Sequence, residues 1–339
     1  MGPHPAVADV RRAVRLALVG VDGPVLVACS GGADSLALAA ALAFEAPRAG
    51  VRAGLVTVDH RLQPGSSAQA ARVAAIGYEM GFDPVLTLPV SVGRAGGPEG
   101  AARQARYAAL SAAAEALAAV VLLGHTLDDQ AETVLLGLGR GSGPRSIAGM
   151  RARTGCYFRP LLGLRRHVTE AACAALGLVP WQDPQNADPS LQRVRLRREV
   201  LPLLEEVLQG GVVEALARTA ALLRDDLDAL DAAAAEEAKA LQGAAPHGAA
   251  LEVASLGQLP RAVRTRVLRS WALARGATEL SAEHTAALDA LVTSWHGQGP
   301  LELPGDLQVR RSSARLQAQP PAQRSDRAAQ PPEKLRVRP

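Results

Sequence analysis

The sequence predicts an α/β protein built on a parallel sheet with helices on both faces, followed by a smaller helical domain. Four β-favouring runs, "VLVAC", "AGLVTVDH", "DPVLTLPV" and "VVLLGH", alternate with Ala- and Leu-rich helical segments at 35–46, 66–80 and 101–118. This alternation is typical of parallel sheets, since each parallel strand needs a crossover connection. The carboxyl ends of the strands then share one edge of the sheet, where open α/β folds bind ligands.

The length and the pattern of the chain indicate more than one domain. Its 339 residues are enough for two modest domains, and the alternation of strands and helices stops near residue 205. Beyond that point leucine recurs at helical spacing, and two further helical segments precede a short predicted hairpin within 301–317. The end of the chain is Pro-rich and predicted to be disordered. The expected regions are a main domain at 1–205, a mainly helical domain at 206–317 and a tail at 318–339.

Composition places the chain among globular proteins with a mild preference for anionic partners. Hydrophobic residues make up 48% and charged residues 21% of the sequence, so a sizeable core is expected. The net charge is +4 and the pI is about 9.3. Lysine occurs only at Lys239 and Lys334. Any phosphate bound by the first two hundred residues is therefore bound without lysine.

Cysteine usage and the N-terminal sequence exclude several classes. Cys29, Cys156 and Cys173 are odd in number, widely spaced and without a C-x-x-C pair, which argues against disulfide frameworks and zinc or iron–sulfur sites. The N-terminal sequence lacks the basic start and apolar run of a signal peptide, and no apolar run is long enough to span a membrane. We therefore expect a cytoplasmic protein with no membrane partner. The oligomeric state stays open, a homodimer included.

The segment "SGGADS", residues 30 to 35, joins the first predicted strand to its helix. Gly31 and Gly32 allow a tight turn and a close approach to an anion, and the following helix presents unpaired N–H groups. Asp34 would repel a polyphosphate unless a divalent cation lay between them, so it indicates a magnesium-bound nucleotide. The alternative is that Ser30 or Asp34 merely caps the helix. The turn has neither a lysine-containing P-loop nor a G-x-G-x-x-G motif.

Polar residues also follow two other predicted strands. Asp59 and His60 end the second strand, and His125 ends the strand "VVLLGH". Asp129 and Glu132 lie three residues apart on the next helix and so on one face, where paired carboxylates hold a metal ion or receive an ammonium group. The alternatives are a helix cap with a surface histidine for the first pair, and a solvated acidic pair for Asp129 and Glu132.

Arginines gather at three places. Arg103 and Arg106 lie three residues apart, and Arg140 and Arg145 lie among glycines; both groups suit phosphates or carboxylates, with solvated surface charge as the alternative. The string "SLQRVRLRREVLP" contains a compact basic patch that suits a nucleic-acid backbone, formed by Arg193, Arg195, Arg197 and Arg198. Aromatic residues make up only 3% of the chain, so base stacking is not expected to be the main mode of recognition.

With these motifs in order, the chain resembles the tRNA(Ile)-lysidine synthase family of the ATP pyrophosphatase, or PP-loop, enzymes. The matching strings are "SGGADS", "VDHRLQPGSSAQAARV", "EGAARQARY", "GHTLDDQAET", "RGSG" with "IAGM", "RPLL" and "WQDPQNADPSLQRVRLRREVLP". They span roughly residues 25 to 205. The resemblance implies an adenine nucleotide alpha hydrolase-like fold, with a catalytic domain at 1–205 and a tRNA-binding domain at 206–317.

The resemblance also implies an activity. Such an enzyme uses ATP and Mg²⁺ to attach L-lysine to C2 of the wobble cytidine in the CAU anticodon of tRNA(Ile). The cytosine O2 attacks the α-phosphorus of ATP and pyrophosphate leaves. The lysine ε-amine then displaces AMP from C2, which completes a carbon–nitrogen bond.

Roles for individual residues follow from the same resemblance. Asp34 is expected to bind the metal, and the four arginines at 193–198 are expected to bind tRNA. Asp129 and Glu132 are expected to hold the lysine ammonium, with Arg103 or Arg106 on its carboxylate; Asp129 is also our candidate for the base that deprotonates the amine. The residues expected to bind ATP are Ser30, Gly31, Gly32, Ala33, Asp34, Ser35, Asp59 and His60, and the expected catalytic residues are Asp34, His125, Asp129 and Glu132.

Three other functions compete with this one. A tRNA thiolase of the same superfamily commonly needs paired cysteines, which the chain lacks. A small-molecule adenylating ligase would not need the arginine patch at 193–198 or a helical second domain. A non-catalytic nucleic-acid-binding module would leave the placement of Asp34, Asp129 and Glu132 unexplained.

Overall fold

The computed structural model describes residues 2–61, 65–93, 97–141, 143–243 and 250–319. The chain forms two compact units, residues 1–223 and 224–339. The helix α10 (Val212–Gly243) crosses from one unit into the other. Most of the predicted tail, residues 320–339, lies outside the described residues, whereas 318 and 319 belong to the last strand.

A mostly parallel sheet forms the centre of the first unit, in the order β3-β2-β1-β4-β6-β5. β1 pairs in parallel with both β2 and β4, and only the short edge strand β5 is antiparallel. The chain builds outward from β1 to β3 and then returns to the other side of β1 with β4, which creates a switch point between β1 and β4. The strands are β1 (Val25–Ala28), β2 (Ala53–Asp59), β3 (Val85–Pro89), β4 (Val120–Leu123), β5 (Arg153–Thr154) and β6 (Tyr157–Phe158).

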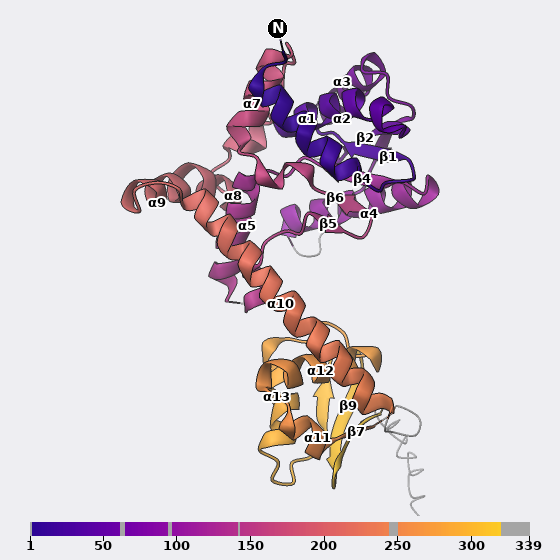
Figure 1. Cartoon of the computed structure of the whole chain (residues 1–339), viewed down its shortest axis with the longest axis vertical. Helices are drawn as coiled ribbons and strands as arrows, with labels where there is room; N and C mark the ends of the chain where they lie inside the picture. The colour runs from indigo at the N-terminus through magenta and orange to yellow at the C-terminus, as the bar shows by residue number, and fades with distance from the viewer. Residues whose placement is uncertain (1, 62–64, 94–96, 142, 244–249, 320–339) are drawn as a thin grey trace, which may run out of the picture. The chain divides into compact units, whose positions relative to one another are not determined.

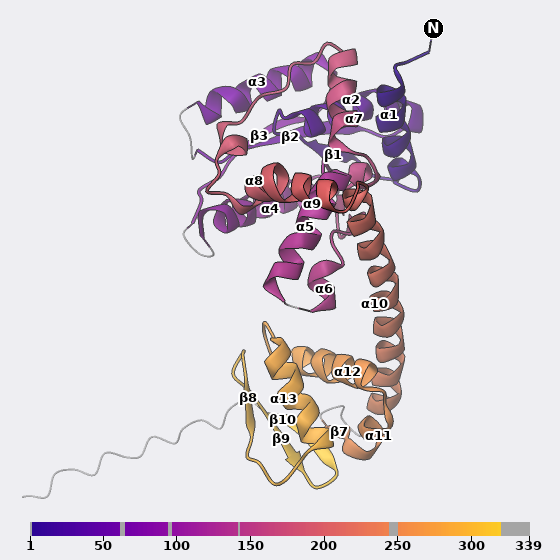
Figure 2. The ribbon, with the colours of Figure 1, turned by 90° about the vertical axis from the view of Figure 1, so that its left-hand side faces the viewer.

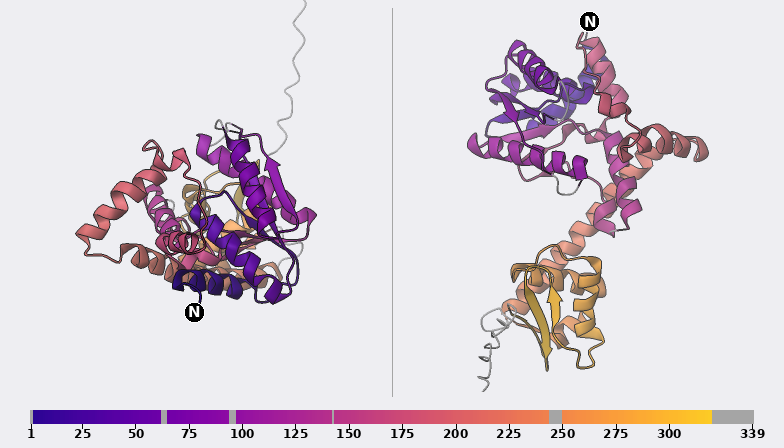
Figure 3. Two further views of the ribbon diagram at one scale, coloured as in Figure 1. Left: turned by 90° about the horizontal axis from the view of Figure 1, so that it is seen from above. Right: turned by 180° about the vertical axis from the view of Figure 1, so that it is seen from behind.

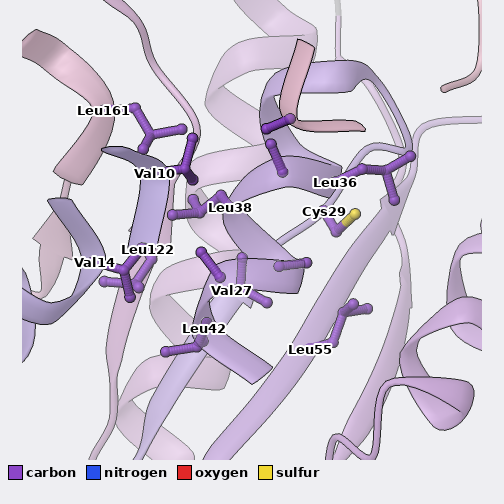
Figure 4. Packing of buried hydrophobic residues seen from close by; sticks show 14 of the residues in the cluster. Val10, Val14, Val27, Cys29, Leu36, Leu38, Leu42, Leu55, Leu122 and Leu161 are labelled. Carbon is purple, nitrogen blue, oxygen red and sulfur yellow. The ribbon is translucent and has the colours of Figure 1, made fainter. Parts of the chain in front are cut away.

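Helices cover both faces of this sheet, as predicted (Figure 1). Alternate strand residues point to opposite faces. Val27 and Leu55 join one core with α1, α2 and α7, drawn in close-up in Figure 4, whereas Leu26 and Val56 join a second core under α4. The helices are α1 (Pro5–Leu18), α2 (Ala33–Glu45), α3 (Ser66–Glu79), α4 (Gly97–Ala116), α5 (Leu127–Arg140), α6 (Pro144–Ile147), α7 (Arg166–Ala175), α8 (Gln192–Arg195) and α9 (Leu201–Val207), with the single turns η1 (Pro47–Ala49), η2 (Pro160–Gly163), η3 (Pro184–Ala187) and η4 (Leu196–Val200), the last of them π-helical.

The second unit combines helices with a four-stranded antiparallel sheet in the order β7-β10-β9-β8. Helices pack on one side of this sheet (Figure 3, right). The hairpin predicted within 301–317 is present as β9 and β10, while the outer strands β7 and β8 are too short for their pattern to be read from the sequence. The elements are α11 (Val253–Gln258), α12 (Arg261–Ala274), α13 (Ala282–Thr293), β7 (Ala250–Glu252), β8 (Leu301–Leu303), β9 (Leu307–Ser312) and β10 (Arg315–Gln319). Within the described ranges, no helix has the length and apolar character needed to cross a membrane.

Candidate active site

The loop after β1 is shaped to receive an anion. Gly31 has φ +89°, and a Cβ there would lie 2.4 Å from Nε2 of Gln69 and 3.0 Å from Cγ2 of Val73, so a side chain fits neither the backbone conformation nor the space. α2 begins directly after Gly32, and no side chain caps its first turn. The first N–H groups of a helix lack intrahelical partners, so they remain available to a ligand. The capping alternative for Ser30 or Asp34 is not what the structure has.

Two serines fold this loop onto itself. The Ser35 hydroxyl accepts the Ser30 N–H at 3.2 Å and donates to the Gly32 carbonyl at 3.0 Å. The hydroxyl oxygens of Ser30 and Ser35 are 3.3 Å apart. Ser35 is buried and Ser30 is exposed. Ser35 therefore holds the turn, and Ser30 is the hydroxyl that a bound phosphate can reach.

Asp34 points from the first turn of α2 toward α7 rather than into open solvent. Its carboxylate accepts a hydrogen bond from the Thr169 hydroxyl, and its Oδ2 lies 3.5 Å from Nε of Arg166. Burial raises the pKa of Asp34 to about 6, although Thr169 and Arg166 pull it down. Asp34 is thus a partly buried carboxylate beside the loop that follows β1.

Asp129 and Glu132 lie on the first turns of α5, which follows β4 on the other side of the switch point. Asp129 takes part in a capping box with Thr126: its Oδ2 accepts the Thr126 N–H at 2.8 Å. Burial raises the pKa of Asp129, but Arg166, Thr126 and His125 outweigh that effect and lower it overall. Glu132 has no exposed surface, and its Oε2 lacks a hydrogen-bond partner among the described residues.

Arginines close the space between these carboxylates. Arg166 donates to Asp129 at 2.6 Å and lies 3.6 Å from Glu132, so it links Asp129 and Glu132 to Asp34. Arg197 donates to Glu132 at 2.8 Å, and Arg193 lies 3.6 Å from the Oε2 of Glu132. Arg193 and Arg197 reach α5 because the run from α8 to α9 passes beside it (Figure 2). Three guanidinium groups therefore face three carboxylates.

The arginine patch predicted at 193–198 is divided by this arrangement. Arg193 and Arg197 turn inward to Glu132. Arg195 is 61% exposed and pairs with Glu199 at 3.0 Å, and Arg198 is exposed. This split follows ordinary helical spacing, because residues four apart share one face of a helix and residues two apart do not. The prediction of a single patch of four arginines did not take that spacing into account.

Two histidines and a buried arginine complete the same edge of the sheet. His60 follows β2, His125 follows β4 and Arg159 follows β6. Nδ1 of each histidine and Nε of Arg159 are buried without a hydrogen-bond partner among the described residues. Burial lowers the pKa of His60, and burial with the nearby Arg159 and Arg106 lowers that of His125 to about 4. Buried polar atoms are nearly always bonded, so this group is typical of a ligand site.

Three further predicted residues are Asp59, Arg103 and Arg106. Asp59 has hydrogen-bond partners within the fold, Arg106 is near the two histidines, and Arg103 is exposed. Asp59 accepts hydrogen bonds from the Ser67 hydroxyl at 2.6 Å and the Arg61 N–H at 3.0 Å; the Ser67 bond leads the effects that lower its pKa. It therefore ties the end of β2 to the first turn of α3 through Ser67. Burial lowers the pKa of Arg106, which lies near His60 and His125, whereas Arg103 is exposed and stacks on Tyr107 at 4.9 Å.

Arg166 and Thr169 were not identified by sequence reasoning, although one signal was available. Arg165 and Arg166 stand together at the beginning of α7. A cation at a helix N-terminus opposes the helix dipole, so two in succession need acidic partners. Here Asp128 pairs with Arg165 at 3.2 Å and accepts the Arg166 N–H at 2.7 Å.

The protein groups fit a magnesium ion shared with a nucleotide rather than a cage of their own. The described residues contain no cluster of three or more histidine, cysteine, aspartate or glutamate side chains able to hold a metal. Mg²⁺ commonly binds one or two carboxylates together with substrate phosphates and water. Asp34, a single carboxylate in the first turn of α2 beside the uncapped N–H groups, matches that requirement.

Comparison with known proteins defines the class first. The family model described as "PP-loop domain" matches residues 10–204, and that described as "TilS substrate binding domain" matches residues 251–317. Among solved structures, the U34-tRNA thiolase NcsA from Methanococcus maripaludis is similar, with a TM-score of 0.50, 20% identity and coverage of 65% of this chain and 80% of that one. The first unit is therefore a PP-loop domain, and at that identity the thiolase supports the fold alone.

Close relatives define the family more narrowly. A tRNA(Ile)-lysidine synthase from Thermobifida fusca (strain YX) is 57% identical over 320 residues, which cover 93% of this chain and 98% of the relative. One from Streptomyces coelicolor is 53% identical over 350 residues, covering 93% and 99%. This chain belongs to the tRNA(Ile)-lysidine synthase family.

Proposed function

We propose that this chain is an ATP-dependent ligase that joins lysine to C2 of the wobble cytidine in the CAU anticodon of tRNA(Ile). The observation that carries the proposal is the meeting of two half-sites at the switch point of the sheet. The anion loop with Asp34 follows β1, and the carboxylates Asp129 and Glu132 follow β4. The family membership of the chain supports the same assignment.

In the first half of the reaction, the cytosine O2 attacks the α-phosphorus of ATP and pyrophosphate departs, leaving an adenylated tRNA. The N–H groups at the start of α2 and the Ser30 hydroxyl would hold the phosphates, as their exposure and lack of caps allow. Asp34 would hold Mg²⁺, which supplies positive charge to the leaving pyrophosphate when bound. His125, uncharged at neutral pH because its pKa is about 4, would lie near the nucleotide without adding charge.

In the second half, the lysine ε-amine attacks C2 and AMP leaves with the former O2. Asp129 and Glu132 would hold the lysine ammonium, and Arg106 its carboxylate. A free lysine amine has a pKa of about 10.4, so it must lose a proton before it attacks. The lowered pKa of Asp129 favours a carboxylate that holds a cation and weakens our initial assignment of Asp129 as the base.

Binding of tRNA would use the outward-facing arginines and the second unit. Arg195 and Arg198 are exposed at the surface of the first unit, and residues 251–317 match the substrate-binding family model. Arg193 and Arg197, directed toward Glu132, would act where the anticodon base enters. A cytoplasmic location is part of the same proposal, because the substrates are tRNA, ATP and free lysine.

The test is incorporation of radiolabelled lysine into tRNA(Ile) with a CAU anticodon. We expect label in tRNA only when ATP and Mg²⁺ are present, with one AMP and one pyrophosphate released for each lysine. A tRNA(Ile) in which the wobble cytidine is replaced by uridine is the matched control and should accept no label. Labelled sulfur entering tRNA from cysteine would instead establish a thiolase, and ATP turnover without tRNA would establish a small-molecule ligase.

A further inference from the structure

Arg166 contacts carboxylates from both halves of the proposed reaction. Its Nη2 donates to Oδ1 of Asp129 at 2.6 Å and lies 3.6 Å from Oε1 of Glu132. Its Nε lies 3.5 Å from Oδ2 of Asp34. The side chain is only 18% exposed. One planar cation thus stands between the anion loop of α2 and the acidic turn of α5.

The helix α7 fixes this guanidinium by several independent contacts. The backbone N–H of Arg166 donates to Asp128 at 2.7 Å, which ties the beginning of α7 to α5. Thr169, one turn later and fully buried, bonds to Asp34 through its hydroxyl. Cys173, a further turn along, donates from Sγ to the Ala33 carbonyl at 3.3 Å. Arg166, Thr169 and Cys173 are three and seven positions apart, so they lie on one face of α7. That face contacts the first turn of α2.

We propose that Arg166 is a positioning residue that couples Mg·ATP binding to lysine binding; this inference rests on the function proposed above. Three carboxylates this close repel one another unless a cation separates them, and the guanidinium fork can bond two of them in fixed geometry. A lysine ammonium that reaches Asp129 competes there with Arg166. The guanidinium then shifts its contact toward the bound phosphates, so each substrate favours the other. Such coupling is reciprocal by thermodynamic necessity.

The experiment measures the dissociation constants of Mg·ATP and of L-lysine by calorimetry, each alone and each with the other present, without tRNA. A non-hydrolysable ATP analogue replaces ATP. In the unmodified protein we expect each ligand to tighten the other by about fivefold or more, the lower end of usual couplings. Arg166→Gln should reduce that factor below about twofold, and Arg166→Lys should recover part of it, since an ammonium keeps the charge but not the fork.

Arg165→Gln is the matched control, because Arg165 occupies the same helix end but pairs with Asp128 and Glu214. It should keep the coupling factor. Equal coupling in Arg166→Gln and the unmodified protein, equal loss in the Arg165 variant, or no coupling in the unmodified protein would each overturn the inference. If Arg166→Gln fails to fold, Arg166→Lys decides the question alone. Coupled binding without incorporation of lysine into tRNA would refute the proposed function while leaving the coupling intact.

Discussion

Each unit of this chain buries an arginine against an aspartate, and the two arrangements differ in kind. In the second unit, Arg264 of α12 donates to Asp289 of α13 at 2.6 Å and to the Leu259 carbonyl at 2.8 Å. Both residues are buried, and the pair joins two helices. Arg261 adds a longer contact to Asp289 at 3.7 Å. Here each charge has a partner, and the geometry explains the burial.

In the first unit the charges are crowded and incompletely bonded. Asp34, Asp129 and Glu132 share Arg166, and Oε2 of the fully buried Glu132 has no hydrogen-bond partner among the described residues. An incompletely satisfied network costs stability, so its retention indicates a use beyond folding. A buried charged pair is therefore by itself poor evidence of function. Several charged side chains packed together at the carboxyl ends of strands, with buried polar atoms that lack hydrogen-bond partners, are better evidence.

Replacing an aspartate by asparagine in each region should affect catalysis in the first unit and stability in the second. Asp34→Asn should reduce pyrophosphate release by at least about a hundredfold, because it removes the proposed metal ligand at the leaving group. The affinity for tRNA should change little, and so should the melting temperature. Asp289→Asn should instead lower the melting temperature and keep turnover at saturating tRNA. Pyrophosphate release and tRNA affinity are measured on both variants; lost tRNA binding in Asp34→Asn would make Asp34 a structural residue.

The buried pair of the second unit can be broken in a way that isolates its cost. Arg264→Met leaves Asp289 buried, with the exposed Arg261 as its remaining ion-pair partner among the described residues. The free energy of unfolding should therefore fall by about 3–5 kcal/mol. The double variant Arg264→Met with Asp289→Leu removes both charges and should recover most of that loss. Urea unfolding followed by circular dichroism measures both. A double variant no more stable than the single one would mean that the pair contributes more than the charges themselves.

The titration of His125 should make the stability of the first unit depend on pH. Burial, with Arg159 and Arg106 nearby, lowers its pKa to about 4, below the usual value of about 6.5. The unfolded chain therefore binds a proton between these values that the folded chain does not, and stability should rise with pH over this range by about 3 kcal/mol. His125→Asn should remove that rise, as seen in urea midpoints measured from pH 4 to 7. An unchanged pH profile in the variant would show that His125 is protonated normally in the folded protein.

The sequence predicted the fold class of the first unit because β1, β2 and β4 are largely buried runs, each followed by a recognisable polar motif. The positions of the anion loop and of the carboxylates of α5 follow from local pattern and the family motifs, whereas the order of the strands in the sheet was not predicted. Arg166 could not be found in the same way, since its partners Asp34 and Asp129 are far away in sequence and meet only through packing of α7. In the second unit, β7 and β8 are three residues each, too short for periodicity to be visible.

The smallest expected effect concerns the exposed arginines. Arg195→Ala should weaken tRNA binding a few-fold and reduce the slope of log affinity against log salt by about 0.7–0.9, the value for one lost phosphate contact. Glu199→Ala is the matched control: it frees Arg195 from its partner 3.0 Å away and should maintain or tighten binding. Arg197→Ala should change this slope less, because its guanidinium is directed at Glu132. Filter binding over a range of salt concentrations measures all three, and equal slopes for Arg195→Ala and the unmodified protein would move the tRNA path away from this surface.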